Sequence, residues 1–124
     1  MVAGRTKNCK MEPMTDARLK AGLWVSAALR LGMLADKPGV LVRRGDPDAG
    51  GILVKLYGRA GAVVLSQFRD MDGVLAWMRS TGPEPVLEDA AEAYIARQVR
   101  MDPDLWVLEF EAADYVPPFE GKIV

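Results

Sequence analysis

The chain has 124 residues, of which 50% are hydrophobic and 27% charged, and its 16 basic and 17 acidic side chains give a net charge of −1. These values predict a single globular domain and argue against a protein that binds polyanions over its whole surface. The sequence has no histidine and only one cysteine. This excludes histidine-based catalysis, and it excludes zinc and iron–sulfur sites built on histidine or thiolate ligands within one chain.

Further absences narrow the function classes. Neither Gly-x-Gly-x-x-Gly nor a Walker-type Gly-Lys-Ser/Thr occurs, so the familiar nucleotide-binding loops are missing. Any catalysis would use carboxylates, lysine, tyrosine or serine. Residues 1–16 contain no apolar segment of signal-peptide length, and the longest apolar run, residues 21–29, is too short to span a bilayer. Together with the single Cys9, these features predict a cytoplasmic protein.

Hydrophobic periodicity and turn-forming residues predict a series of helices and strands. In chain order they are a strand Arg18–Val25, a helix Ala27–Ala35, strands Val40–Arg44, Gly51–Tyr57, Ala62–Phe68 and Val74–Arg79, a helix Glu88–Met101 and a strand Leu105–Glu111. The segment Val74–Arg79 also fits one helical turn, but the flanking glycines favour a strand. The order β-α-β-β-β-β-α-β predicts an α+β fold, with a largely antiparallel sheet of about five to six strands and two helices on one face.

The segment VLVRRGDPDAGGILVKL, residues 40–56, is expected at the centre of the sheet. Two apolar runs flank the turn formers Gly45–Gly50, which is typical of a β-hairpin. Residues 1–15 are expected to form a flexible lead, 16–112 a single α+β domain and 113–124 a C-terminal tail. We expect the tail to lie outside the core and to be removed by proteolysis, because it contains two prolines and no clear periodicity.

Several stretches together resemble one protein family. They are Arg18–Ala27, Arg44–Gly50, Tyr94 with Arg97 and Gln98, and Asp102–Val107. Over residues 16–112 the chain is similar to small bacterial proteins grouped as domain of unknown function 1491, with Gly-Asp-Pro-Asp-Ala-Gly and Asp-Pro-Asp-Leu-Trp as the most specific motifs. The lead, the tail and residues 69–87 lie outside this similarity. The resemblance implies a bacterial, cytoplasmic, single-domain protein, and it supplies no catalytic residues because the family has no assigned reaction.

The motif Asp-Pro-Asp occurs twice, at residues 46–48 and 102–104. Its ordinary interpretation is a turn in which the aspartate accepts local backbone N–H groups and the proline sets the next φ angle. If the last strand lies beside the hairpin, Asp46, Asp48, Asp102 and Asp104 would converge on one site. Carboxylates in such a cluster are suitable ligands for Mg²⁺ or Ca²⁺. No cofactor is expected apart from this candidate divalent cation.

Arg43, Arg44 and Arg97 are candidate binding residues, because a guanidinium can hold a phosphate or carboxylate. Adjacent strand residues point to opposite faces, so Arg43 and Arg44 cannot both line one pocket. Solvation, pairing with nearby carboxylates and helix-end electrostatics are the ordinary interpretations. The three tryptophans are expected in the core, and few basic residues accompany the aromatic ones, so nucleic-acid binding is not expected.

These observations favour a non-enzymatic protein-interaction or self-associating module. Two alternatives stay open: a divalent-metal-dependent enzyme that uses aspartates on a phosphate-containing substrate, and an RNA-associated accessory module. The sequence does not decide whether the chain is an enzyme. We expect an unknown protein partner or a homodimer, and no membrane association. The homodimer is expected to bury an exposed strand edge, for which the uncharged, proline-free Gly61–Leu65 is the candidate.

Overall fold

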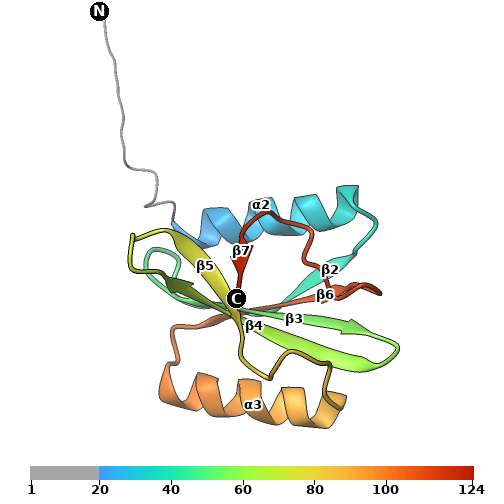
Figure 1. The fold of residues 1–124 in the computed structure, drawn as a ribbon. Helices are drawn as coiled ribbons and strands as arrows, with labels where there is room; N and C mark the ends of the chain where they lie inside the picture. The colour runs from blue at the N-terminus through green and yellow to red at the C-terminus, as the bar shows by residue number, and fades with distance from the viewer. Residues whose placement is uncertain (1–19) are drawn as a thin grey trace, which may run out of the picture.

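The computed structural model describes residues 20–124, which fold into two helices and a six-stranded sheet. In chain order the elements are α2 (Ala21–Leu34), β2 (Gly39–Arg43), β3 (Ile52–Gly58), β4 (Gly61–Arg69), β5 (Leu75–Arg79), α3 (Glu88–Met101), β6 (Trp106–Glu111) and β7 (Lys122–Ile123). Helix α2 covers one face of the sheet and α3 the other (Figure 1). The predicted α+β class is confirmed, whereas the prediction that both helices lie on one face is wrong.

The strands follow the order β2-β6-β3-β4-β5-β7 across the sheet. Strand pairs β2–β6, β3–β4 and β4–β5 are antiparallel, while β3–β6 and β5–β7 are parallel. The sheet is therefore mixed, and the prediction of a largely antiparallel sheet is wrong. The parallel pairs arise because α3 carries the chain back across the sheet between β5 and β6, and the last residues return it to β5.

The predicted hairpin over residues 40–56 does not form. Both of its strands exist as β2 and β3, but β6 lies between them and pairs with each. The side chains of Trp106, Leu108 and Phe110 on β6 are buried under α2, with exposed fractions of 2%, 0% and 0%. A strand this apolar is better covered at the centre of the sheet than at its edge, so a long-range pairing replaces the local one.

The residues predicted as the first strand belong to a helix. Helix α2 begins at Ala21, and the part of the predicted strand before residue 20 lies outside the described residues. Its buried positions, Ala21, Val25, Ala28 and Gly32, recur at spacings of four, three and four, which is one helical face. Gly32 is tolerated because a Cβ there would lie 2.8 Å from the Phe110 ring, so the glycine lets the helix approach the sheet closely.

Helix α3 has the predicted bounds, Glu88–Met101, with acidic residues in its first turn and Arg100 in its last. Its buried residues Ala91 and Ile95 pack on the second sheet face together with Leu53, Val64 and Val107. The segment that fitted either a strand or a helical turn is strand β5, as predicted. The predicted lead, residues 1–15, lies outside the described residues.

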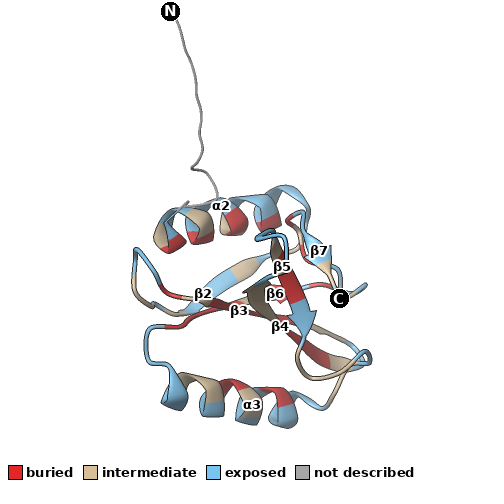
Figure 2. Cartoon of the chain, turned by 60° about the vertical axis from the view of Figure 1, so that its left-hand side comes forward, coloured by how far each residue is buried: buried red, intermediate tan, exposed pale blue. Residues whose placement is uncertain are grey.

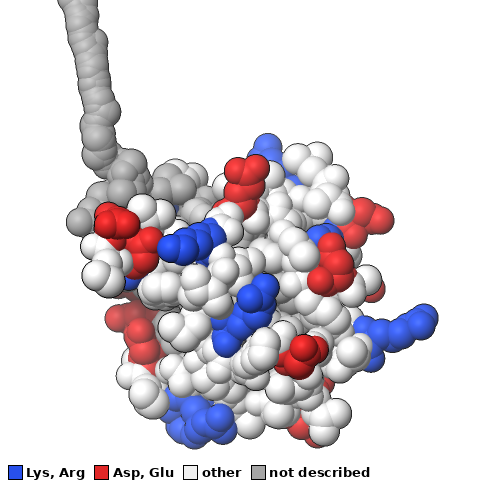
Figure 3. Space-filling model, viewed as in Figure 1, with Lys and Arg blue, Asp and Glu red and all other residues white. Residues whose placement is uncertain are grey.

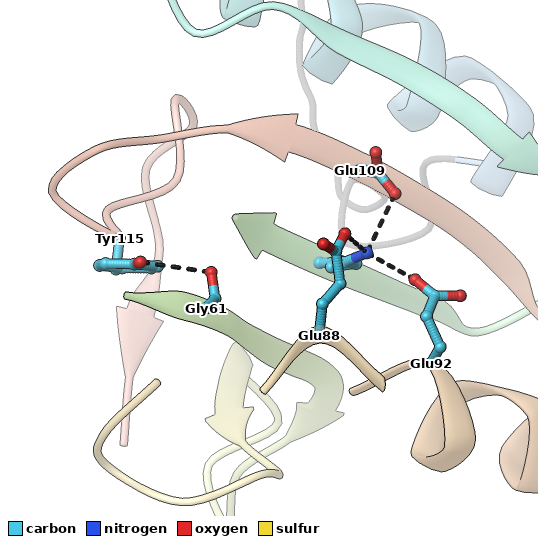
Figure 4. A network of polar contacts seen from close by, with 6 residues as sticks. Gly61, Glu88, Glu92, Glu109 and Tyr115 are labelled. Carbon is cyan, nitrogen blue, oxygen red and sulfur yellow. Dashed lines mark hydrogen bonds and ion pairs between the residues drawn. The ribbon is translucent and has the colours of Figure 1, made fainter. Parts of the chain in front are cut away.

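The C-terminal tail packs into the core, so the prediction that it lies outside is wrong. Phe119 is 8% exposed, and its ring lies 5.0 Å from the rings of both Trp24 and Trp77. The Tyr115 hydroxyl donates a hydrogen bond to the Gly61 carbonyl oxygen (Figure 4). It also accepts one from the Ala60 N–H. The prolines of this segment keep it irregular without keeping it out of the core.

The free edges of the sheet are β2 and the two-residue β7. Gly61–Leu65, predicted as the exposed edge, lies in β4, which pairs with β3 on one side and β5 on the other. That prediction is wrong, since Val63, Val64 and Leu65 are core residues. Neither helix within residues 20–124 is long and apolar enough to cross a membrane.

Candidate functional site

The structure brings the two Asp-Pro-Asp segments side by side. The Asp46 N–H donates a hydrogen bond of 3.0 Å to the Asp104 carbonyl oxygen, and the Trp106 indole N–H donates one of 2.7 Å to the Asp46 carbonyl oxygen. This contact exists because β6 starts beside the start of β3 and runs parallel to it. The two loops therefore lie close together, as the candidate cation site requires.

Two of the four carboxylates, those of Asp46 and Asp102, are engaged within their own turns. Asp46 Oδ1 accepts the N–H groups of Asp48 at 2.8 Å and Ala49 at 3.3 Å, and Asp102 Oδ1 accepts the Asp104 N–H at 3.1 Å. The Asp48 carboxylate lies 3.5 Å from the Lys20 ammonium at an exposed position. Across residues 20–124, no group of three or more histidine, cysteine, aspartate or glutamate side chains is arranged to hold a metal ion. The geometry fits the turn interpretation of both motifs.

The three candidate arginines lie at different places in the structure. Arg43 Nη2 donates a hydrogen bond of 2.8 Å to the Pro103 carbonyl oxygen, and the Arg44 guanidinium lies 5.4 Å from the centre of the Trp106 ring. Arg43 is paired with Val107 on the α3 side of the sheet, whereas Trp106 belongs to the core under α2. Arg97 is exposed on α3, and no hydrogen bond or ion pair joins it to either loop among the described residues. The three arginines do not form one anion site.

A groove with a volume of about 750 Å³ lies beside the first acidic loop. It runs between the first turn of α2, residues 48–52 and the turn that joins β4 to β5, with Trp24 and Phe68 among its apolar walls. Two charged side chains on its rim already have local partners, because Asp48 faces Lys20 and Arg69 donates to the Gly73 carbonyl oxygen. The groove therefore lacks a convergent set of polar groups that would orient a small ligand.

A buried ammonium group lies on the opposite side of the sheet. Lys55 is 2% exposed, and its Nζ lies 2.7 Å from Glu88, 2.5 Å from Glu92 and 3.4 Å from Glu109. Figure 4 shows the three carboxylates directed at this nitrogen from α3 and β6. Burial would lower the pKa of Lys55, but the hydrogen bonds to Glu88 and Glu92 outweigh it and the pKa is raised. The network fastens the first turns of α3 to the sheet.

Exposed apolar side chains gather on two adjacent elements. Among residues 20–124, fourteen large hydrophobic side chains are exposed, and seven of them lie on α2 and β2. We call these seven the α2–β2 surface: Leu23, Leu31, Met33, Leu34, Val40, Leu41 and Val42. In Figure 2 the outward side of α2 and most of β2 are coloured as exposed. Arg30 is the only charged residue in α2.

The sequence pattern does not predict the α2–β2 surface, because it favours Val40–Arg44 at the centre of the sheet and divides α2 between a strand and a helix. One signal was available. The apolar residues of AGLWVSAALRLGML surround the whole helix, which is more than one buried face requires. By contrast, charged side chains are dispersed on the face seen in Figure 3, without a basic patch.

The fold is that of a small α+β domain in which a mixed sheet lies between two helices. Exposed apolar side chains are concentrated on one of these helices, α2, and on the edge strand β2. The chain belongs to the DUF1491 family, a protein family of unknown function whose model matches residues 19–120. The predicted resemblance is confirmed, and the match extends through residues 69–87 and beyond residue 112, which the prediction had excluded.

Solved structures of relatives agree with the fold. A DUF1491 family protein from Caulobacter crescentus CB15 is 31% identical, and its crystal structure aligns over 86% of this chain and 99% of that chain with a TM-score of 0.77. An NMR structure of a DUF1491 family protein from the same organism aligns at 31% identity over 86% and 97% of the two chains, with a TM-score of 0.75. Protein Atu0922 from A. tumefaciens, 22% identical over 82% and 92% of the chains with a TM-score of 0.68, shares the fold. No curated protein matches the chain.

Proposed function

We propose that this domain is a non-enzymatic protein-interaction module that binds through the α2–β2 surface. The observation that carries the proposal is the concentration of exposed apolar side chains there. Met33 and Leu34 are 77% and 78% exposed, and Val40 and Val42 are 57% and 54% exposed. Exposed apolar side chains concentrated on neighbouring elements mark sites where proteins associate, because association removes them from water.

The surface also offers unpaired backbone groups. Strand β2 pairs with β6 on one side, and among residues 20–124 no strand pairs with its other side. A partner could add a strand there and cover the neighbouring apolar side chains at the same time. Direct binding is favoured over the metal-dependent alternative, because Oδ1 of Asp46 and Oδ1 of Asp102 accept turn amides and no group of three or more possible ligands within residues 20–124 is arranged to hold a metal ion. A bacterial origin and a cytoplasmic location belong to this proposal, and the organisms of the relatives support the first.

The test is affinity capture with matched variants. Leu23→Glu and Val42→Glu place a charge on the α2–β2 surface, and Leu87→Glu places one on an apolar side chain that is 79% exposed at the start of α3, outside the surface. We expect Leu23→Glu and Val42→Glu to reduce capture of a protein partner, including a second copy of this chain, at least about tenfold, as the loss of a buried apolar contact does. Leu87→Glu should capture as the wild type does.

Circular dichroism and thermal melts establish that all three variants are folded. Retention of every captured protein by both surface variants would refute the proposal. So would loss of the same proteins from Leu87→Glu, because the effect would then not belong to the α2–β2 surface.

A further inference from the structure

The backbone of β2 presents a definite set of hydrogen-bonding groups to solvent. The Glu111 N–H donates to the Pro38 carbonyl oxygen, so residue 38 faces β6. In an antiparallel ladder the direction alternates from residue to residue, so Val40 also faces β6. Gly39 and Leu41 therefore direct their N–H and C=O groups away from the sheet. These four groups form the usable edge.

We propose that a second copy of this chain pairs with β2 across a two-fold axis at Val40. This inference rests on the proposed function, since it names the partner of the same surface. In this antiparallel register Gly39 of each copy exchanges both backbone hydrogen bonds with Leu41 of the other, and Val40 faces Val40. The pairing uses all four free groups and joins two sheets into one, with both α2 helices on the same face.

The common protections of an edge strand are absent from Gly39–Leu41. This stretch contains no charge, and the missing N–H of Pro38 would face β6, so the proline does not interrupt the outer side. The register of β2 shifts between Leu41 and Arg43. A bulge of this kind ends regular pairing. It confines the new ladder to the residues before Val42, as the two-fold at Val40 requires. The other free edge, β7, has only two residues and offers no comparable ladder.

The charges at the ends of β2 select a second copy in antiparallel orientation. Arg43 and Arg44 lie at one end of the strand, and the exposed Asp36 precedes the other. The two-fold axis brings the arginine end of each copy to the aspartate end of the other, whereas a parallel arrangement would join like charges. Lys37 does not oppose this, because its ammonium lies 3.0 Å from the Asp114 carboxylate of its own chain.

Disulfide trapping tests the register. In a Cys9→Ser background, Val40→Cys places two thiols at a directly opposed pair with Cα atoms about 4.5 Å apart, within the range that a disulfide spans. In Val42→Cys the two thiols lie about 13 Å apart along the strands and cannot be joined. We expect mild oxidation to link Val40→Cys into covalent dimers and to leave Val42→Cys unlinked.

Sedimentation tests the assembly in the otherwise unmodified chain. We expect its mass to rise from 13.5 kDa toward twice that value over a micromolar concentration series. Val40→Lys, which brings two ammonium groups together at the axis, should stay monomeric. Met101→Lys, at a side chain 77% exposed at the end of α3, should assemble as the wild type does. Hydrogen exchange of the Gly39 and Leu41 amides should slow at least tenfold on assembly.

Equal linking of Val40→Cys and Val42→Cys would refute the register. A wild-type chain that stays at 13.5 kDa up to high micromolar concentration would refute the second copy as partner. Loss of a captured partner from Leu23→Glu and Val42→Glu in that same case would leave the proposed function standing, with another protein at the edge. If the wild type stays at 13.5 kDa and neither Leu23→Glu nor Val42→Glu loses a captured partner, both the second copy as partner and the proposed function are refuted.

Discussion

The backbone N–H of Asp46 donates a 3.0 Å hydrogen bond to the carbonyl oxygen of Asp104, and this bond joins two Asp-Pro-Asp turns from distant parts of the chain. It fixes the point at which β6 enters the sheet beside β3, because β6 starts two residues after Asp104. The approach is close enough that a Cβ at Gly45 or Gly50 would lie 2.2 or 2.3 Å from the Asp104 oxygen. Glycine is therefore required sterically on both sides of the first turn.

Gly50→Ala should separate the two turns. A Cβ at this position must displace the Asp104 backbone, and overpacking of this kind costs about 1–3 kcal/mol of unfolding free energy. The adjacent Gly51→Ala is the control, because its nearest contact is the flexible Leu105 side chain at 3.2 Å. Urea denaturation measures both variants. Equal losses in the two would show that the contact with Asp104 does not limit the approach.

The contributions of Glu88 and Glu92 to the unfolding free energy should be non-additive, because both carboxylates contact Lys55. Glu88→Gln or Glu92→Gln alone leaves Lys55 with a close carboxylate, and each should cost about 0.5–1 kcal/mol of unfolding free energy. The double variant leaves only Glu109, at 3.4 Å, beside a buried ammonium group. Its loss of unfolding free energy should exceed the sum of the two single losses by about 1 kcal/mol or more.

Asp89→Asn controls for the effect of removing a negative charge from the first turn of α3, since Asp89 lies there without a contact to Lys55. Thermal and urea unfolding at neutral pH measure the four variants. Strict additivity of the two glutamine substitutions would contradict a shared role in neutralising Lys55.

The tail should stabilise the domain. Phe119→Ala removes a ring packed against Trp24 and Trp77 and should cost about 3–5 kcal/mol of unfolding free energy. Val116→Ala, at a side chain 50% exposed, should change it by less than about 0.5 kcal/mol. Limited proteolysis should spare residues 113–124 in the wild type. Rapid removal of these residues without loss of thermal stability would contradict the packing described.

The Lys37–Asp114 ion pair should make stability depend on pH in the acid range. The hydrogen bond from Lys37, followed by that from the Val116 N–H, lowers the pKa of Asp114 below its ordinary value. A carboxyl with a lowered folded-state pKa stabilises the fold above its unfolded pKa, and this contribution is lost as the pH falls through the folded value.

Asp114→Asn should therefore melt below the wild type at pH 7, and the difference should shrink below about pH 4 as the wild-type carboxyl is protonated. Asp36→Asn is the control, because it removes another exposed carboxyl and asparagine tolerates the positive φ of 59° found there. A difference that stays constant from pH 7 to pH 2 would contradict the role of the ionised pair.

Divalent cations should leave the melting temperature unchanged. Asp46 and Asp102 already accept turn N–H groups, and no metal-binding cluster is assembled within residues 20–124. Thermal melts with millimolar Mg²⁺, Mn²⁺ or Ca²⁺ check this in the wild type, Asp48→Asn and Asp104→Asn. A wild-type rise of several degrees that both variants abolish would instead establish a site, since a bound cation stabilises the folded state.

The sequence by itself determined the elements whose signals are local. Helix α3 has acidic residues in its first turn, Arg100 in its last and a helical apolar period, so its bounds are predicted correctly. Asp46 and Asp102 act as turn residues through contacts two residues away, and β3 and β4 join through a short glycine turn. The motifs that carry the family resemblance are equally local, and the family match over residues 19–120 confirms that resemblance.

Only the tertiary structure decided which strands are neighbours. Every strand offers the same backbone donors and acceptors, so local pattern shows that Val40–Arg44 and Gly51–Tyr57 are strands without showing that β6 separates them. The burial of Phe119 likewise depends on Trp24 and Trp77, which no local period connects to it. The α2–β2 surface follows from the strand order, because β2 is exposed at the edge only when β6 takes the central place beside β3.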